Sequence, residues 1–252
     1  MKVIAQTAAL QEALALISHI VASRSPKPVL QCIKLVAKDG TLTLLGTDME
    51  AAARYQITAV EIAEEGEALV PADRFSGIVR ESGDADSLTI ETEKEAVILR
   101  GAGSRFRVFG YDPGEFPSVA EFPDAEDFQV GATELSGMIS RTLFATAKGH
   151  SQYAISGVLW ETSGKKLQLI ATDGHRVALA KGSLQAPAAS DISAIVPAKL
   201  MSLIMRIAGD SQEMLAVKID ENQILVRTAR AVLVSSLVQG NFPKYKDVIP
   251  KD

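Results

Sequence analysis

The chain has 252 residues, a hydrophobic content of 47% and a formal net charge of −5. This length suggests one large or two ordinary domains, and the hydrophobic content is ample for packed cores. No apolar run approaches the roughly 20 residues needed to span a bilayer, and the amino terminus lacks a signal-peptide pattern. The single cysteine, Cys32, excludes an internal disulfide framework. These features predict a cytoplasmic protein with no membrane partner.

The first half of the chain alternates between helical and strand-like patterns. Apolar residues recur at helical spacing over 7–21, with Thr7 predicted as the N-cap, and Ser25-Pro26-Lys27-Pro28 ends this helix. A shorter helix follows Val70-Pro71 and closes near Gly83. An acidic stretch at 121–127, which contains a proline, is predicted to be a linker. Strands are predicted at 29–36, 42–47, 52–60, 88–90, 96–99 and 105–109.

The second half repeats this order of elements. Thr133 is predicted to cap a helix that aligns with the first helix at an offset of 125 residues. Val196-Pro197 and Asn241-Phe242-Pro243 lie 126 residues after Val70-Pro71 and Glu115-Phe116-Pro117. Because these landmarks agree within one residue, we predict two repeated α+β domains, 1–125 and 126–252, each with two helices packed on antiparallel β-sheets. The remaining elements are a helix at 198–209 and strands at 155–161, 167–172, 176–181, 215–219, 224–228 and 232–238.

Charge is unevenly distributed between the helices and the rest of the chain. A net charge of +3 is carried by the predicted helical segments taken together, 6–24, 72–81, 133–148 and 198–208. Because the whole chain has a net charge of −5, the remaining residues together carry −8. Ordinary solvated helix faces would explain a bias of this size. The alternative is a helix-lined surface that contacts phosphates independently of base sequence, in a molecule that otherwise repels DNA.

The segment from Leu167 to Ala180 has the alternation of two antiparallel strands joined by a tight turn at Asp173-Gly174. An enzyme using Asp173, His175 and Arg176 as an acid–base group is one alternative. Asp-Gly at a hairpin tip is more often turn chemistry, and the repeat keeps Asp48 but not the other two residues. No histidine pair has ligand spacing, and no glycine-rich phosphate loop is present. We therefore predict no catalytic residue, no metal and no cofactor.

A family resemblance rests on motifs spread along the whole chain. Ala171-Thr172-Asp173-Gly174-His175-Arg176, Ile195-Val196-Pro197 and Asn241-Phe242-Pro243-Lys244-Tyr245 closely resemble the bacterial sliding clamp, the β subunit of DNA polymerase III. The segments 40–48, 70–72 and 104–106 also fit this family. The resemblance implies the DNA-clamp fold, with helices lining a ring around duplex DNA and sheets on the outside. It further implies a non-catalytic processivity factor of DNA replication, which tethers the replicative polymerase, the clamp loader and other clamp-binding-motif proteins to DNA.

The resemblance also assigns site residues by position. The pocket for partner peptides would consist of Ile155, Thr172, Gly174, His175, Arg176, Val177, Pro243 and Val248. Ile155 and Val177 stand where leucine is common, and Ala154 stands where an aromatic residue can occur. The DNA-binding residues would be Arg24, Arg80, Lys148, Tyr153, Lys199 and Arg206. The ring-interface edge of the first domain would carry Arg74, Arg100, Arg105 and Phe106.

The length of the chain departs from the family pattern. The family has three such domains and closes as a head-to-tail homodimer, whereas this chain has two repeats. We expect a truncated fragment that holds the first two of three clamp domains and is a monomer, because its ring-closing partner surface is missing. Weak, salt-sensitive DNA binding and weakened peptide binding would follow. A trimer of two-domain chains and a purely structural repeat protein are the alternatives.

Overall fold

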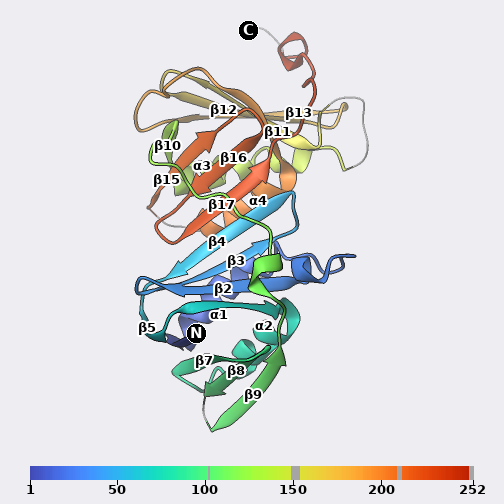
Figure 1. The fold of residues 1–252 in the computed structure, drawn as a ribbon. Coiled ribbons are helices and arrows are strands. Elements are labelled where there is room, and N and C mark those ends of the chain that lie inside the picture. Colours follow the sequence, from blue (N-terminus) through green and yellow to red (C-terminus); the bar gives the residue numbers. More distant parts are fainter. Residues whose placement is uncertain (102, 149–153, 209–211, 250–252) are drawn as a thin grey trace. The chain divides into compact units, whose positions relative to one another are not determined.

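The computed structural model describes residues 1–101, 103–148, 154–208 and 212–249, which form two compact units (Figure 1). Unit 1 consists mainly of residues 1–120, and unit 2 mainly of residues 121–252. Both units combine helices with antiparallel sheets, so the predicted α+β class is confirmed. None of the described helices is long and apolar enough to cross a membrane.

Unit 1 contains two antiparallel sheets with two helices (Figure 1). Its strands follow the orders β5-β1-β7-β8-β9 and β4-β3-β2-β6. Helix α1 contacts strands of both sheets, and α2 packs beside α1 against β6 and β9. The elements are β1 (Lys2–Gln6), α1 (Thr7–Ile17), β2 (Cys32–Lys38), β3 (Thr41–Thr47), β4 (Ala51–Ile57), β5 (Val60–Glu64), β6 (Gly66–Pro71), α2 (Ala72–Glu81), β7 (Ser87–Glu93), β8 (Ala96–Gly101) and β9 (Ser104–Phe109).

Unit 2 repeats the plan, with the strand orders β13-β12-β11-β14 and β10-β15-β16-β17. Helix α3 packs beside α4 and contacts β10 and β13, while α4 contacts β11 and β14. The elements are β10 (Phe128–Gly131), α3 (Ala132–Ser140), β11 (Gly157–Ser163), β12 (Lys166–Thr172), β13 (Val177–Ser183), β14 (Ser193–Pro197), α4 (Ala198–Ala208), β15 (Met214–Ile219), β16 (Gln223–Arg227) and β17 (Ala231–Ser236).

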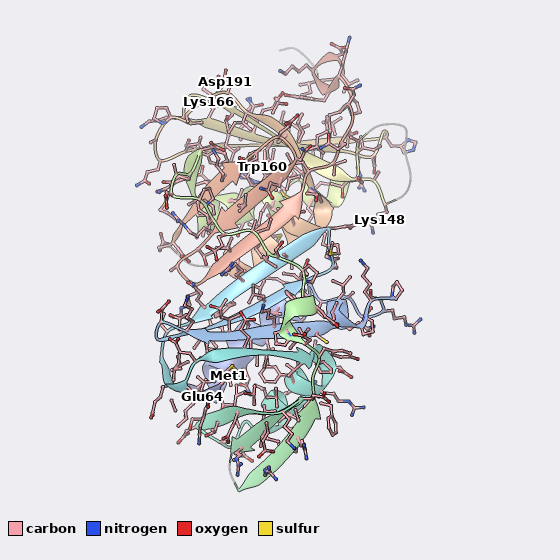
Figure 2. The ribbon with its side chains drawn as sticks, in the orientation of Figure 1. Met1, Glu64, Lys148, Trp160, Lys166 and Asp191 are labelled. Atoms are coloured by element: carbon pink, nitrogen blue, oxygen red, sulfur yellow. The ribbon has the colours of Figure 1, made fainter. Side chains whose placement is uncertain are left out.

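The cores lie where the apolar helix faces meet the sheets. In unit 1, Leu10, Ile17 and Phe75 are fully buried. In unit 2, Trp160 of β11 (Figure 2) is fully buried. Its Nε1 lies 3.3 Å from the Met201 sulfur of α4. Fully burying side chains of this size contributes about 1.5–3 kcal/mol each, so these contacts dominate the packing of helix on sheet.

Both predicted threonine caps are wrong. Thr7 is the first residue of α1, Gln6 stands at the N-cap, and the buried Thr7 hydroxyl donates to the Ala85 carbonyl at 2.5 Å. Thr133 is the second residue of α3, which begins after Gly131. Both helices start directly at the end of a strand, and the extended N-cap positions are occupied by Gln6 and Gly131, neither of which makes a side-chain cap hydrogen bond.

Some predicted strand boundaries are also wrong. The strand predicted at 29–36 begins with a 3₁₀ turn, Pro28–Gln31, because Pro28 lacks the N–H that a ladder requires. The strand predicted at 52–60 ends at Ile57, and two further strands, β5 and β6, occupy 60–71. The short strands β1 and β10 precede α1 and α3 and have too few residues to establish an alternating pattern.

Candidate partner-binding site

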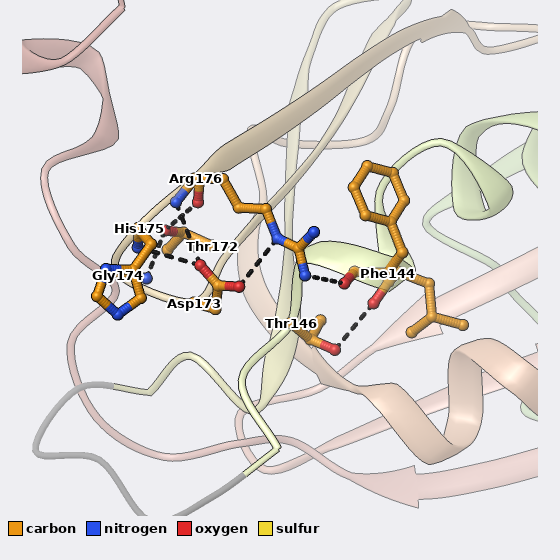
Figure 3. A network of polar contacts seen from close by, with 8 residues as sticks. Phe144, Thr146, Thr172, Asp173, Gly174, His175 and Arg176 are labelled. Atoms are coloured by element: carbon orange, nitrogen blue, oxygen red, sulfur yellow. Dashed lines mark hydrogen bonds and ion pairs between the residues drawn. The ribbon is translucent and has the colours of Figure 1, made fainter.

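The tip between β12 and β13 is a tight turn held by its own side chains (Figure 3). The Thr172 hydroxyl donates to the Arg176 carbonyl at 2.7 Å and accepts the Gly174 N–H at 3.1 Å. Gly174 has a φ of +90°, in the region that disfavours any residue with a Cβ atom. The Thr172 side chain therefore closes the turn, and Gly174 adopts the required positive φ without strain.

Asp173 contributes three further hydrogen bonds to the same turn (Figure 3). Its Oδ1 accepts the backbone N–H groups of His175 at 3.0 Å and Arg176 at 3.2 Å, and its Oδ2 accepts Arg176 Nε at 2.9 Å. The backbone hydrogen bond from His175, followed by those from Arg176, lowers the pKa of the Asp173 carboxyl. A carboxylate that is occupied in this way and has a lowered pKa is a poor general base.

Arg176 extends from the hairpin to the 3₁₀ turn Leu143–Ala145 (Figure 3). Its Nη2 donates to the Phe144 carbonyl at 3.1 Å, and its guanidinium carbon lies 5.4 Å from the centre of the Phe144 ring. The Phe144 side chain is 58% exposed. Phe144 is not among the residues predicted from the sequence, although an aromatic residue just beyond a helix end, outside the apolar stripe, is the signal that would have indicated it. The tip thus presents a cation and an open aromatic face together.

The other predicted pocket residues differ in how far a partner could reach them. Val177 is 36% exposed and Val248 is 67% exposed, whereas Ile155 is only 6% exposed and offers little surface. A cavity of about 590 Å³ opens in unit 2, but Pro243 is the only predicted pocket residue that lines it. Its other lining residues come from β11, β14, Glu221 and the segment 237–247. The hairpin tip itself lies outside this cavity.

The predicted DNA-binding residues that the structure describes are all exposed. Arg24 follows α1 and Arg80 lies in the last turn of α2, where it forms an ion pair with Glu81 at 3.3 Å. In unit 2, Lys199 and Arg206 are seven residues apart on α4, so they share one face of that helix. Lys148 is exposed after α3, and Tyr153 lies outside the described residues.

The predicted ring-interface residues lie on and beside one hollow of unit 1. Arg74 and Phe106 line a cavity of about 630 Å³ together with Ile78. Arg100 of β8 and Arg105 of β9 lie opposite each other on neighbouring strands. Arg100 forms an ion pair with Glu91 at 3.6 Å, and Arg105 forms one with Glu93 at 3.5 Å. Phe109, which is not among the residues predicted from the sequence, lines the same cavity and is 68% exposed.

A metal site would require several histidine, cysteine, aspartate or glutamate side chains placed close together. Among the described residues, no group of three or more histidine, cysteine, aspartate or glutamate side chains is placed to hold a metal ion. The Cys32 thiol is buried, and its burial, together with the charge of Asp73, raises its pKa to about 11.

Comparisons with known proteins agree with this geometry over nearly the whole chain. The DNA polymerase III beta subunit N-terminal domain matches residues 1–120, and the central domain of the same subunit matches residues 129–244. The chain belongs to this family. The resemblance stated from the motifs is therefore confirmed.

Individual family members show the extent of the match. The chain is 30% identical to the beta sliding clamp of Pseudomonas aeruginosa over 98% of this chain and 67% of that protein. It is 31% identical to the beta sliding clamp of Escherichia coli over 94% of this chain and 64% of that protein. The chain also superposes on the crystal structure of the DNA polymerase sliding clamp from Bacillus subtilis with a TM-score of 0.95 and 28% sequence identity. The match covers all of this chain and 68% of the Bacillus subtilis chain. The clamp fold is thus confirmed, and the chain spans about two thirds of the length of these relatives.

Proposed function

We propose that the protein acts in DNA replication as a sliding clamp, a processivity factor that encircles duplex DNA and tethers the replicative DNA polymerase. The observation that supports this most strongly is the consecutive match to the N-terminal and central domains of the DNA polymerase III beta subunit. The protein has no catalytic role in this proposal, because the Asp173 carboxylate is engaged in the turn. The hydrolase alternative is not supported by any described group.

Within this function, the unit 2 tip forms one wall of the peptide pocket. An exposed guanidinium beside the open Phe144 ring, with Val177 and Val248 also exposed, suits a short peptide with hydrophobic anchors and polar flanks. Polymerase, clamp loader and other clamp-binding-motif proteins would bind here. The complete set of residues is Ile155, Thr172, Gly174, His175, Arg176, Val177, Pro243 and Val248.

Residues on and beside the helices would contact DNA without reading base sequence, the basic ones through its phosphates. Those concerned are Arg24, Arg80, Lys148, Tyr153, Lys199 and Arg206. We assign clamp domains to 1–125 and 126–252, and a third domain would complete the protein as a head-to-tail homodimer ring in the cytoplasm. In that ring Arg74, Arg100, Arg105 and Phe106 lie at the subunit interface. The two-domain chain alone would be a monomer.

Peptide binding tests the pocket directly. A fluorescein-labelled peptide bearing the clamp-binding motif of the replicative polymerase is titrated with the chain and with Val177→Asp, and anisotropy is measured. We expect Val177→Asp to weaken binding at least about tenfold, because a carboxylate would then have to be desolvated against the hydrophobic anchor. The matched control is Met49→Asp on the exposed tip of unit 1, which should bind as the unmodified chain does. Equal affinity in all three proteins would contradict the proposed site.

DNA binding is tested by its salt dependence. Lys199→Glu and Arg206→Glu should each lower the affinity for duplex DNA and reduce the slope of log K against log salt by about 0.9 per lost phosphate contact. Light scattering during size exclusion gives the mass of the same samples. If neither substitution changes the slope, α4 does not contact DNA. A trimer mass would contradict the expected monomer.

A further inference from the structure

One buried tyrosine anchors the segment that carries Pro243 and Val248. Tyr245 is 6% exposed and packs in a cluster with Leu159 of β11 and Ile195 of β14. Its Oη donates to Glu161 Oε2 at 2.5 Å. Tyrosine hydroxyls that are buried normally find a partner, but this partner lies 84 residues away on β11. The contact therefore links the segment around Tyr245 to strand β11 and not to another residue of the same segment.

The two pocket residues on this segment are each tied to Tyr245 through the backbone. The Tyr245 N–H donates to the Pro243 carbonyl at 2.7 Å, and the Val248 N–H donates to the Tyr245 carbonyl at 3.2 Å. The Phe242 ring stands edge-on to the Tyr245 ring, at 75° and 6.4 Å between centres. A shift of Tyr245 would thus be passed on to both Pro243 and Val248.

The environment of Tyr245 keeps its hydroxyl a hydrogen-bond donor. Burial, and then the hydrogen bond to the Glu161 carboxylate, raises the pKa of Tyr245 above its ordinary value. The other Glu161 oxygen lies 3.9 Å from Lys246 Nζ, on a side chain that is 74% exposed, so this ion pair contributes little. The phenol–carboxylate contact is the stronger of the two.

Unit 1 offers a natural comparison at the equivalent positions. Val36 and Val119 lie 125 and 126 residues before Glu161 and Tyr245, and both pack against a cluster that includes Phe116. At these two positions unit 1 therefore has apolar side chains, and its closing segment is held instead by Arg54, whose Nη1 donates to the Val119 carbonyl at 3.4 Å. At this pair of positions, a hydrogen bond between the two side chains is possible only in unit 2, whose closing segment carries predicted pocket residues.

We propose that Glu161 and Tyr245 are positioning residues of the peptide pocket: their hydrogen bond holds the segment 242–248 so that Pro243 and Val248 face an incoming peptide. This inference rests on the function proposed above. Neither side chain needs to touch the peptide. Their contribution is to keep one wall of the pocket in place before the peptide arrives, which lowers the ordering cost of binding.

Three variants of this contact separate positioning from folding. Tyr245→Phe keeps the packed ring and removes the donor, and Glu161→Leu removes the acceptor. Glu161→Gln retains a side-chain oxygen that can accept from the hydroxyl. We expect the first two to weaken binding of the fluorescein-labelled clamp-binding peptide about threefold to tenfold. Glu161→Gln should restore affinity to within about twofold of the unmodified chain.

Matched controls exclude general destabilisation. Tyr55→Phe removes the hydroxyl of a buried tyrosine in unit 1, and Lys246→Gln removes the weak ion pair, so both should bind the peptide normally. Hydrogen exchange should accelerate in 242–248 for Tyr245→Phe, with exchange of β11 and β12 unchanged. Binding by the unmodified chain and by Tyr245→Phe with equal affinity would overturn the positioning role alone. No binding by the unmodified chain would overturn the proposed pocket and this inference together.

Discussion

The hairpin tips of the two units, 47–51 and 172–176, are built on the same hydrogen bonds but differ in side chains. In unit 1 the Thr47 hydroxyl donates to the Ala51 carbonyl and accepts the Met49 N–H, and Asp48 Oδ1 accepts the N–H groups of Glu50 and Ala51. Unit 2 has the same four bonds 125 residues later. The difference is that only the unit 2 tip carries a glycine at the strained position and an arginine.

This comparison separates scaffold from function. The threonine and aspartate, which both tips share, build the turn, whereas the Arg176 guanidinium adds a bond to Asp173 and also reaches a second element. Residues present in both units are therefore best explained by folding, and residues present in one unit by a task that only this unit performs. The Glu161–Tyr245 contact obeys the same logic.

The largest expected effect on stability comes from giving the unit 2 tip the unit 1 residue. Gly174→Met should destabilise the chain by about 1–2 kcal/mol, because a side chain is placed at positive φ. An added Cβ would meet nothing within 4 Å, so the cost is conformational rather than steric. Urea unfolding followed by circular dichroism measures it. An unchanged midpoint would mean that the turn relaxes to another conformation.

The reverse exchange should stabilise unit 1 by a smaller amount. Met49 has a φ of +79° and is 59% exposed, so its side chain gains little from packing in return for this backbone conformation. Met49→Gly removes that strain but adds flexibility to the unfolded chain, which leaves a net gain of about 0.5–1 kcal/mol. The same urea titration tests it, with Glu50→Gly as the control that should not stabilise. A loss of stability in Met49→Gly would show that the methionine side chain packs favourably.

The smallest effect concerns acid. The pKa of Asp173 is lowered in the folded state, so its contribution to stability is present above the unfolded value of about 3.9 and is lost as the pH falls through the folded value. In Asp173→Asn, the free energy of unfolding should therefore fall less steeply below about pH 4, and it should differ only modestly from that of the unmodified chain at neutral pH. Thermal unfolding from pH 7 to pH 2.5 compares the two proteins. Parallel curves throughout that range would contradict the predicted linkage.

Local patterns predicted the repeated architecture and the tips well. The Val-Pro pairs before α2 and α4 fixed both helix starts, and the Thr-Asp-Gly order contains its own turn chemistry. The strands β5 and β6 were missed because their alternation is short and is broken at Gly66, which has positive φ. The Arg176–Phe144 and Glu161–Tyr245 contacts join residues 32 and 84 positions apart. No local periodicity encodes such pairs, so only the folded chain reveals them.

Trp160 has a practical consequence that follows from its place in β11. It is the only tryptophan in the sequence, and it is fully buried in the core of unit 2 against the Met201 sulfur. Its fluorescence therefore reports the unfolding of unit 2 alone, whereas far-ultraviolet circular dichroism reports both units. If the two signals change at one denaturant concentration, the repeats unfold as a single cooperative system. If the two signals change at different denaturant concentrations, the transition seen by Trp160 fluorescence belongs to unit 2 and the other transition to unit 1.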